Sequence, residues 1–315
     1  MRILFCGFIM FSLVLVNSRA EVGNQEEDKI ELRSVRGDDL PWSRSADASR
    51  FFQDARVVNL CKAIDKQDVR RVEELLDDGV SVNSQGLHKV TPLVWCLPVT
   101  DSGVFELLLR RGADPNVAFM GDFPGSPLLK GGTATVLVAK YCPAKALRLV
   151  LAHNGNASGE RVTQSPRGLV PFGECCLLAA ISSHRDPTLK IRQLLAKGAE
   201  PRPKGQLFPL LSAAIWAKQF ESALVLLAAG ADAGVYSRDN LLACHHLAEQ
   251  SRHKHSESDV ERIHLLTDLL KAKDAWRTDA LKEITEFRRL TKAGQWDVAR
   301  EYTRSLRASD GKDGA

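Results

Sequence analysis

The sequence has few aromatic residues, no long alternation of apolar and polar residues, and little excess of charge. Phe, Trp and Tyr account for 6% of the 315 residues. Because exposed strands alternate apolar and polar residues, the lack of such runs argues against a sheet-based enzyme fold. The net charge is only +4, and lysine and glutamate residues are interleaved along the chain. Without a sustained basic stripe, nucleic-acid binding is not expected.

Catalytic motifs are missing as well. The chain contains no GxSxG, no HExxH and no glycine-rich phosphate loop, the short patterns that place nucleophiles, metal ligands or phosphates. Charged residues make up 26% of the chain and are scattered, as they are on solvent-exposed helix faces. We therefore expect no enzyme activity and no cofactor.

The N-terminus carries a long apolar run. Arg2 is followed by the run Ile3–Val16 and then by small residues at Ser18 and Ala20. The run is shorter than the about 20 residues that span a bilayer, and the pattern is typical of a secretory signal peptide. We predict a signal peptide over residues 1–20, cleaved after Ala20, and a secreted or periplasmic protein with no membrane span after cleavage. An uncleaved segment that anchors the chain is the alternative.

Pairs of leucines followed by a glycine recur along the middle of the chain. The glycines are Gly79, Gly112, Gly155, Gly198 and Gly230, which lie 33, 43, 43 and 32 residues apart. A period near about 33 with insertions of about ten residues is typical of a helical solenoid. One helix pair cannot bury its own apolar surface, so neighbouring units must stack.

The second unit shows the recurring pattern most completely. Thr91-Pro92-Leu93 opens it, Leu107-Leu108-Leu109 closes it, and Gly112-Ala113-Asp114 follows. This block resembles the ankyrin repeat, whose pattern is TPLHxA, a second helix ending in LL, and then GAD. The resemblance covers about residues 58–273. It implies an all-α, ankyrin-type helical solenoid of about six irregular repeats.

The chain departs from the family pattern in two ways. The histidine of TPLH is absent from every unit, and its place is taken by Val94, Leu137, Leu178 and Leu211. The hydrogen bonds that this histidine makes between repeats are then missing, so we expect packing to set the register and the stack to be irregular. In addition, long fingers are inserted at residues 117–133 and 156–174, and such surface loops often carry function.

The sequence divides into five segments. After the signal peptide, residues 21–50 are polar and charged and are predicted to form a flexible linker. Residues 51–275 form the predicted repeat domain. Residues 276–308 hold two amphipathic patterns, which predict a C-terminal helical cap over the open end of the stack. Residues 309–315 are predicted to be a disordered tail, and the whole protein is expected to be a monomer.

The resemblance implies a binding surface built from the first helix of each unit and from the fingers. The residues expected to face it are Pro98 and Val99, Tyr141 and Cys142, Ser182 and Ser183, and Ile215 and Trp216. Because Tyr and Trp are frequent interface anchors, we expect Trp216 and Tyr141 to contact an unidentified protein partner. Phe119 and Phe123 in the first long finger are the next candidates. The alternative is that these aromatics pack against their own repeats.

The sequence thus predicts a non-catalytic protein–protein interaction scaffold that is exported from the cytoplasm. A metal-binding protein is one alternative, because Cys244, His245, His253 and His255 lie close together in the last unit and can bind zinc or copper. Their spacing, however, matches no tight tetrahedral site. A structural adaptor tethered to a membrane by an uncleaved N-terminal segment is the other alternative.

The cysteines leave two states open. The mature chain would keep Cys61, Cys96, Cys142, Cys175, Cys176 and Cys244. Cys61 and Cys96 fall on first helices where small residues pack, which favours buried thiols, whereas an exported protein with an even number of cysteines allows a disulfide. Asn156 lies in a glycosylation sequon in the second long finger.

Overall fold

The structure is a computed structural model. It describes residues 47–100, 103–120, 131–165, 168–201, 209–237 and 239–309, with the side chains of 161–174 left out. The predicted signal peptide, most of the predicted linker, Phe123 and nearly all of the predicted tail lie outside the described residues. Within these ranges, no helix combines the length and the apolar character that a membrane crossing requires.

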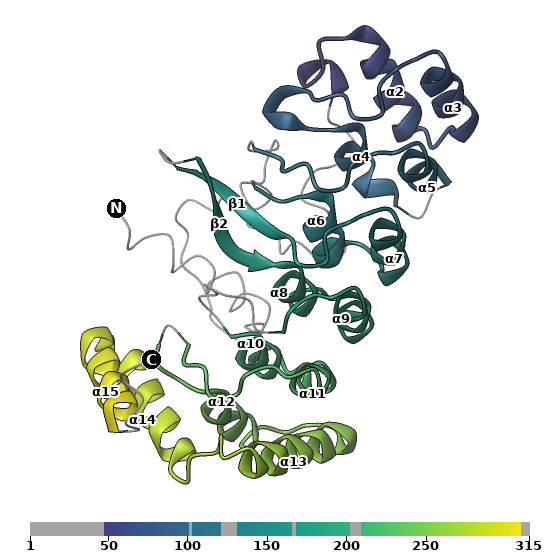
Figure 1. The fold of residues 1–315 in the computed structure, drawn as a ribbon. Helices are drawn as coiled ribbons and strands as arrows, with labels where there is room; N and C mark the ends of the chain where they lie inside the picture. The colour runs from purple at the N-terminus through teal and green to yellow at the C-terminus, as the bar shows by residue number, and fades with distance from the viewer. Residues whose placement is uncertain are drawn as a thin grey trace, which may run out of the picture.

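Six helix pairs stack in sequence order (Figure 1). The inner helices are α2 (Ala55–Asp65), α4 (Pro92–Trp95), α6 (Ala134–Tyr141), α8 (Cys176–Ile181), α10 (Leu210–Trp216) and α12 (Ala243–Gln250). The outer helices are α3 (Val69–Asp77), α5 (Gly103–Arg110), α7 (Ala144–Ala152), α9 (Pro187–Ala196), α11 (Phe220–Ala228) and α13 (Glu257–Ala272). Inner helices pack on inner helices and outer on outer, as α10 does on α12 and α11 on α13. The ankyrin-type solenoid of about six repeats is confirmed.

Residues just before the inner helices fix where these helices begin. The hydroxyls of Thr91 and Thr133 each accept a hydrogen bond from the backbone N–H three residues later, at 3.3 Å. This bond satisfies a donor that has no partner inside the helix, which is the role of an N-cap. Pro209 stands at the same place before α10, which begins at Leu210.

These helix starts correct the expected position of the family's histidine, which is the third residue of each inner helix. The position falls on Val136 in α6 and on Ser212 in α10, one residue away from Leu137 and Leu211. The prediction that the histidine is absent from every unit is also wrong. His245 holds the position in α12, where its Nδ1 accepts a hydrogen bond from the backbone N–H at the helix start.

Most outer helices end on a glycine in the left-handed region of the backbone. These residues are Gly79, Gly112, Gly198 and Gly230, with φ between 83° and 93°. Glycine adopts this conformation without a side-chain clash and so ends helices readily. In the third repeat Asn154 takes this place, with φ of 65°. Gly155 is needed for a different reason, because a Cβ there would lie 2.5 Å from the side chain of Val150.

The second long finger contains a β-hairpin. Strands β1 (Glu160–Ser165) and β2 (Gly168–Cys175) pair in an antiparallel manner, with Thr163 opposite Val170. The hairpin projects from the inner-helix side of the stack (Figure 1). Among the described residues it is the exception to an otherwise helical fold, and it lies within the finger that the sequence predicts at residues 156–174.

One apolar cluster runs through all six repeats, from Ala48 to Ala280. At its N-terminal end, the rings of Phe51 and Phe52 lie 5.8 and 6.2 Å from that of Trp95. The short 3-10 helix η1 (Ala48–Arg50) precedes them and buries Ala48. Ala48, which falls within the predicted linker, is therefore part of the apolar cluster. Two further 3-10 helices are present. η2 (Leu87–Lys89) lies in the short connection between α3 and α4, and η3 (Leu97–Val99) follows α4.

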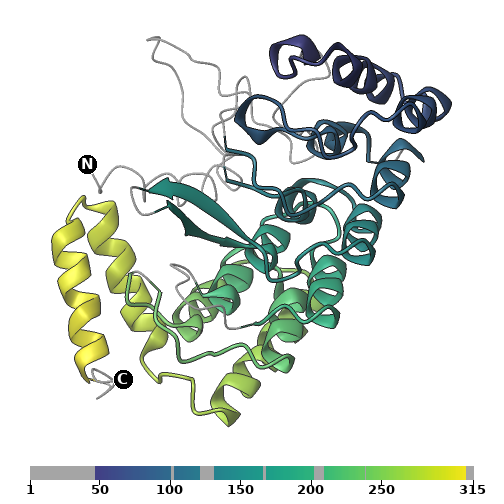
Figure 2. The same cartoon turned by 45° about the horizontal axis from the view of Figure 1, so that its top comes forward.

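Two helices follow the sixth repeat. α14 (Ala280–Lys292) packs along α12, and α15 (Trp296–Ser309) packs on α14. Their separate apolar cluster consists of Leu241, Ile284, Phe287, Leu290 and Ala299. The pair lies on the same side of the stack as the β1–β2 hairpin (Figure 2). The guanidinium carbon of Arg307 in α15 lies 5.4 Å from the ring centre of Tyr236, so α15 reaches back to the finger of the fifth repeat.

Candidate binding face

The inner side of the stack presents a row of half-buried residues, one from each repeat after the first. Each lies seven positions after the N-cap and follows a buried residue; they are Pro98, Lys140, Ser182, Trp216 and Glu249. Because the inner helices stack side by side, these five residues form a continuous row, which we call the inner-face row. In each pair predicted to face the partner, one residue is buried, namely Val99, Cys142, Ser183 or Ile215.

A ladder of hydrogen bonds lies directly beneath the inner-face row. In repeats two, three and four, the residue just before the inner-face-row member has a backbone carbonyl oxygen that accepts a hydrogen bond from a side chain of the next repeat. The bonds are Cys142 Sγ to Leu97 O at 3.8 Å, Lys190 Nζ to Ala139 O at 3.1 Å, and Gln219 Nε2 to Ile181 O at 2.6 Å. The last carbonyls of a helix have no partner within it. The ladder satisfies them and fixes one repeat against the next.

Lys190 in α9 is the charged member of this ladder. Its side chain is fully buried, and its Nζ also donates to Ser183 Oγ at 2.6 Å. Burial lowers the pKa of Lys190 to about 8. A cation is favoured at the C-terminal end of a helix, where unpaired carbonyls carry partial negative charge. Lys190 therefore joins the fourth repeat to the end of α6 in the third.

The two main sequence candidates lie two repeats apart on the inner side of the stack. Trp216 ends α10 and Tyr141 ends α6, with α8 between these helices. Tyr141 is half-buried against the core, and Lys140 Nζ lies 5.6 Å from its ring centre. Trp216 is also half-buried, but within the described part of the chain its indole makes neither a hydrogen bond nor a ring contact. Trp216 thus leaves a donor and an apolar surface available.

The prediction that Phe119 contacts a partner is wrong. Its side chain is 1% exposed and belongs to the main apolar cluster. The ring packs edge-on against His88 of the preceding finger, and its backbone N–H donates to Gly132 O at 2.9 Å. The first long finger folds back on its own stack at this residue. The other finger candidate, Phe123, lies outside the described residues.

The candidate metal ligands do not converge. Cys244 and His245 are buried, whereas His253 is exposed. His255 Nε2 bonds to Gln250 O at 2.8 Å, and its ring packs edge-on against Phe220. Among the residues that the structure describes, no group of three His, Cys, Asp or Glu side chains is arranged to hold a metal ion.

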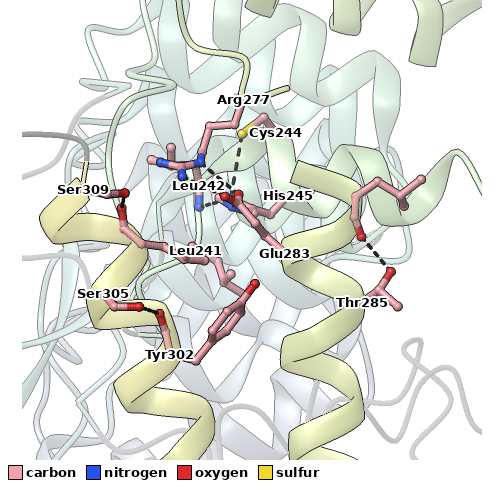
Figure 3. Close-up of polar contacts among 12 residues, drawn as sticks. Leu241, Leu242, Cys244, His245, Arg277, Glu283, Thr285, Tyr302, Ser305 and Ser309 are labelled. Atoms are coloured by element: carbon pink, nitrogen blue, oxygen red, sulfur yellow. Dashed lines mark hydrogen bonds and ion pairs between the residues drawn. The ribbon is translucent and has the colours of Figure 1, made fainter. Parts of the chain in front are cut away.

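His245 instead takes part in a buried network that sequence reasoning missed (Figure 3). Its Nε2 donates to Glu283 Oε2 at 2.8 Å. Arg277 donates to both oxygens of the same carboxylate, at 2.9 and 2.7 Å. Burial opposes the charge of Glu283, but the bonds from His245 and Arg277 outweigh it and lower its pKa to about 2. The network fastens α14 to the sixth repeat, and we call it the α14 latch.

The protonation of His245 follows from the bond at its other nitrogen. Leu242 N–H donates to Nδ1 at 2.9 Å, which requires a lone pair there and places the proton on Nε2. A second proton on Nδ1 would break the bond from Leu242, so the observed geometry is that of the neutral ring.

Cys244, His245 and Glu283 follow the order of a nucleophile, a base and an orienting carboxylate. Cys244 Sγ lies 3.8 Å from His245 Nδ1. However, all three side chains are buried, and the lone pair that a base would need is used by Leu242 N–H. A general base must be free to accept a proton next to substrate. The arrangement therefore holds helices together and offers no access to a substrate.

The six cysteines that follow the predicted signal peptide are buried thiols. They are Cys61, Cys96, Cys142, Cys175, Cys176 and Cys244. Burial raises the pKa of Cys61 and of Cys96 well above the ordinary range. Cys175 has a local role, because its Sγ accepts from Leu178 N–H at 3.5 Å at the start of α8. Buried thiols, the first of the two expected states, are confirmed.

Comparison with solved structures agrees with the ankyrin resemblance. An ankyrin repeat domain from Acinetobacter baumannii AYE matches with a TM-score of 0.50 and 18% identity, over 66% of this chain and 96% of that chain. The human ASB11 ankyrin repeat domain matches with a TM-score of 0.48 and 22% identity, over 67% and 82%. No protein-family model matches the sequence, and neither does any curated protein. The first likeness shows that the chain has the fold of ankyrin repeat domains.

Proposed function

We propose that this chain is a non-catalytic protein-binding scaffold, exported from the cytoplasm, whose inner-face row contacts a partner protein. The observation that carries the proposal is Trp216, a half-buried tryptophan with no partner within the described part of the chain. It lies on rigid, stacked helices, and a preorganised aromatic side chain loses little conformational freedom on binding. Tryptophan is also among the residues that most often dominate binding energy.

The scaffold is held rigid beneath the proposed contact surface. Gln219, three residues after Trp216, donates to Ile181 O at 2.6 Å and so ties the fifth repeat to the fourth. A surface fixed in this way needs no ordering step before it binds. Catalysis has less support, because the nucleophile-like arrangement found among the described residues, around His245, is buried.

Photo-crosslinking tests the binding surface. A photoreactive phenylalanine analogue is placed at Ser182 in the inner-face row, and in a control protein at Leu189 on the outer side, which is 51% exposed. Cells expressing either protein are irradiated, and products are identified by mass spectrometry. We expect the analogue at Ser182, but not the one at Leu189, to crosslink to a defined partner protein. Adding Trp216→Ala to the protein labelled at Ser182 should lower the amount of this crosslinked product about tenfold, as expected for the loss of an interface anchor. Equal products from both positions would refute the inner-face row as the contact surface.

The export part of the proposal has a separate test. The apolar segment at residues 1–20 supports secretion, and loss of Arg2 and Arg19 with it would lower the net charge from +4 to +2. N-terminal sequencing of the native protein is expected to begin at Glu21. Retention of residues 1–20 would instead support the membrane-tethered adaptor.

A further inference from the structure

The turns between inner and outer helices carry positive charge in the second half of the stack. We define the turn edge as residues 182–186, 217–219 and 251–256, which connect the two helices of repeats four, five and six. Its cationic residues are Arg185, Lys218, Arg252 and Lys254, with His184, His253 and His255 beside them. Asp186 is the one acidic residue in these turns. Because inner helices stack in register, the three turns follow one another along one edge.

In the part of the chain that the structure describes, three of these cations lack the carboxylate partners that several other arginines of the protein have. On the outer helices and the C-terminal pair, for example, Arg262 pairs with Asp259 at 3.1 Å and Arg289 with Glu286 at 2.6 Å. Within the described residues, Lys218, Arg252 and Lys254 take part in no ion pair, and all three are exposed. Arg252 donates a hydrogen bond to Thr285 Oγ1 at 3.0 Å, but none of the three charges is neutralised by a carboxylate of the described residues.

The turn edge adjoins Trp216, the half-buried tryptophan of the inner-face row. Lys218 lies two residues after Trp216 in the same turn, and it holds a left-handed backbone conformation with φ of 58°. A residue with a side chain adopts this conformation at a cost in free energy that glycine would avoid. The fifth repeat thus presents one cation and one apolar side chain together, with the basic turns of the fourth and sixth repeats on either side.

We infer that the turn edge binds an acidic protein segment that carries an apolar residue among its carboxylates. This inference rests on the proposed scaffold function and names the chemistry of its partner. The apolar residue packs on Trp216, and carboxylates reach Lys218 and the pair Arg252 and Lys254. Neighbouring helices lie about 8–10 Å apart and an extended chain rises about 3.3 Å per residue. Acidic residues about every third position therefore match successive repeats.

A protein segment fits this surface better than a nucleic acid does. Much of the affinity for a duplex comes from Lys and Arg contacts to phosphates, and the turn edge offers only four such residues. The chain also has a net charge of only +4. A single apolar anchor surrounded by charges is typical of the centre and rim of a protein interface.

Selection from a phage-displayed library of random peptides of about 12 residues, long enough to span three or four repeats when extended, tests the inference. We expect peptides selected on the mature chain to be enriched in Asp and Glu, with one conserved apolar position. The strongest peptide is then measured by fluorescence anisotropy. Its affinity is expected to fall at least about tenfold in Lys218→Glu/Arg252→Glu/Lys254→Glu, because reversed charges repel the ligand.

The matched control reverses three exposed outer cations, Arg148→Glu/Lys197→Glu/Lys273→Glu, which makes the same change in net charge. This control is expected to change the affinity less than about twofold, apart from long-range effects that salt screens. Circular dichroism confirms that both triple variants are folded. Selection of neutral or basic peptides, no selection at all, or equal losses in the two triple variants would overturn the inference.

Two further probes test whether the turn edge binds a nucleic acid or an anionic membrane instead of a protein segment. A fluorescent DNA duplex and vesicles with anionic lipid are each titrated with the wild type and the two triple variants. Stronger binding of either probe than of the peptides, lost in the turn-edge variant, would overturn a protein partner. If selected peptides are not acidic but lose affinity in Trp216→Ala, the scaffold function stands and only the acidic partner is wrong. Crosslinking at Ser182 tests the scaffold function independently.

Discussion

The joint between the first two repeats and the joint between the last repeat and α14 use similar groups in opposite environments. In the first, Arg111 spans the exposed carboxylates of Glu73 and Asp77 on α3. In the second, an arginine and a histidine enclose Glu283, whose side chain is only 7% exposed. Water and salt screen the first joint but not the second.

This difference predicts where the molecule is vulnerable. Exposed ion pairs contribute little to stability, because both partners are well solvated when apart. Removing one partner of a buried pair leaves the other charge in a place that water cannot reach. The C-terminal pair therefore depends on a few buried polar groups in addition to its small apolar cluster, while the first repeats depend on apolar packing around residues such as Phe105.

Glu283→Ala is expected to have the largest effect. It leaves Arg277 without its buried carboxylate, and breaking a buried pair in this way costs about 3–5 kcal/mol. We expect α14 and α15 to detach, seen as rapid proteolysis between α13 and α14 and as an early step in urea unfolding. Glu286→Ala is the control, because its partner Arg289 is exposed. Similar proteolysis of both variants would show that the α14 latch does not hold the pair.

Lys190→Met tests the buried cation between the third and fourth repeats. The pKa of Lys190 is about 8 in the folded protein and 10.5 ordinarily. Between these values the unfolded chain binds more protons, so the stability of the wild type should rise with pH, by about 3 kcal/mol in all. The variant should lack this rise, because methionine does not titrate. The free energy of unfolding is measured in urea at several pH values from 8 upward. Lys197→Met, at an exposed lysine, is the control. If stability rises with pH as steeply in Lys190→Met as in the wild type, Lys190 is not the group responsible.

The fold could be predicted from the sequence because its signals are local. A leucine pair, a glycine that takes the left-handed conformation and a period near about 33 residues specify the helix pairs and their stacking. The exact register could not be predicted. It depends on which residue caps each inner helix, and Thr133 and Pro209 shift the register by one residue from the expected pattern.

The candidate site was predictable only in part, because its key contacts join distant residues. Trp216 could be selected as an aromatic at a surface position, but the burial of Phe119 depends on how its finger folds back. The bonds of His245 to Glu283 and of Lys190 to Ala139 O span 38 and 51 residues. One signal could have found Glu283, which shares an otherwise apolar helix face with Ile284 and its neighbours in α14.

Of the substitutions at Glu283, Lys190 and Asn83, Asn83→Ala is expected to have the smallest effect. It tests the exposed joint between the first two repeats. Asn83 Nδ2 donates to Gly112 O at 2.9 Å, and Asp114 N–H donates to its Oδ1 at 2.7 Å. Since water can replace both bonds at this exposed finger, we expect a loss of about 1 kcal/mol, read from the urea midpoint. Asn59→Ala is the matched control on the exposed side of α2 and should be neutral or slightly stabilising, because alanine favours helix. Equal midpoints for the two variants would show that the hydrogen bonds of Asn83 do not help to join the first two repeats.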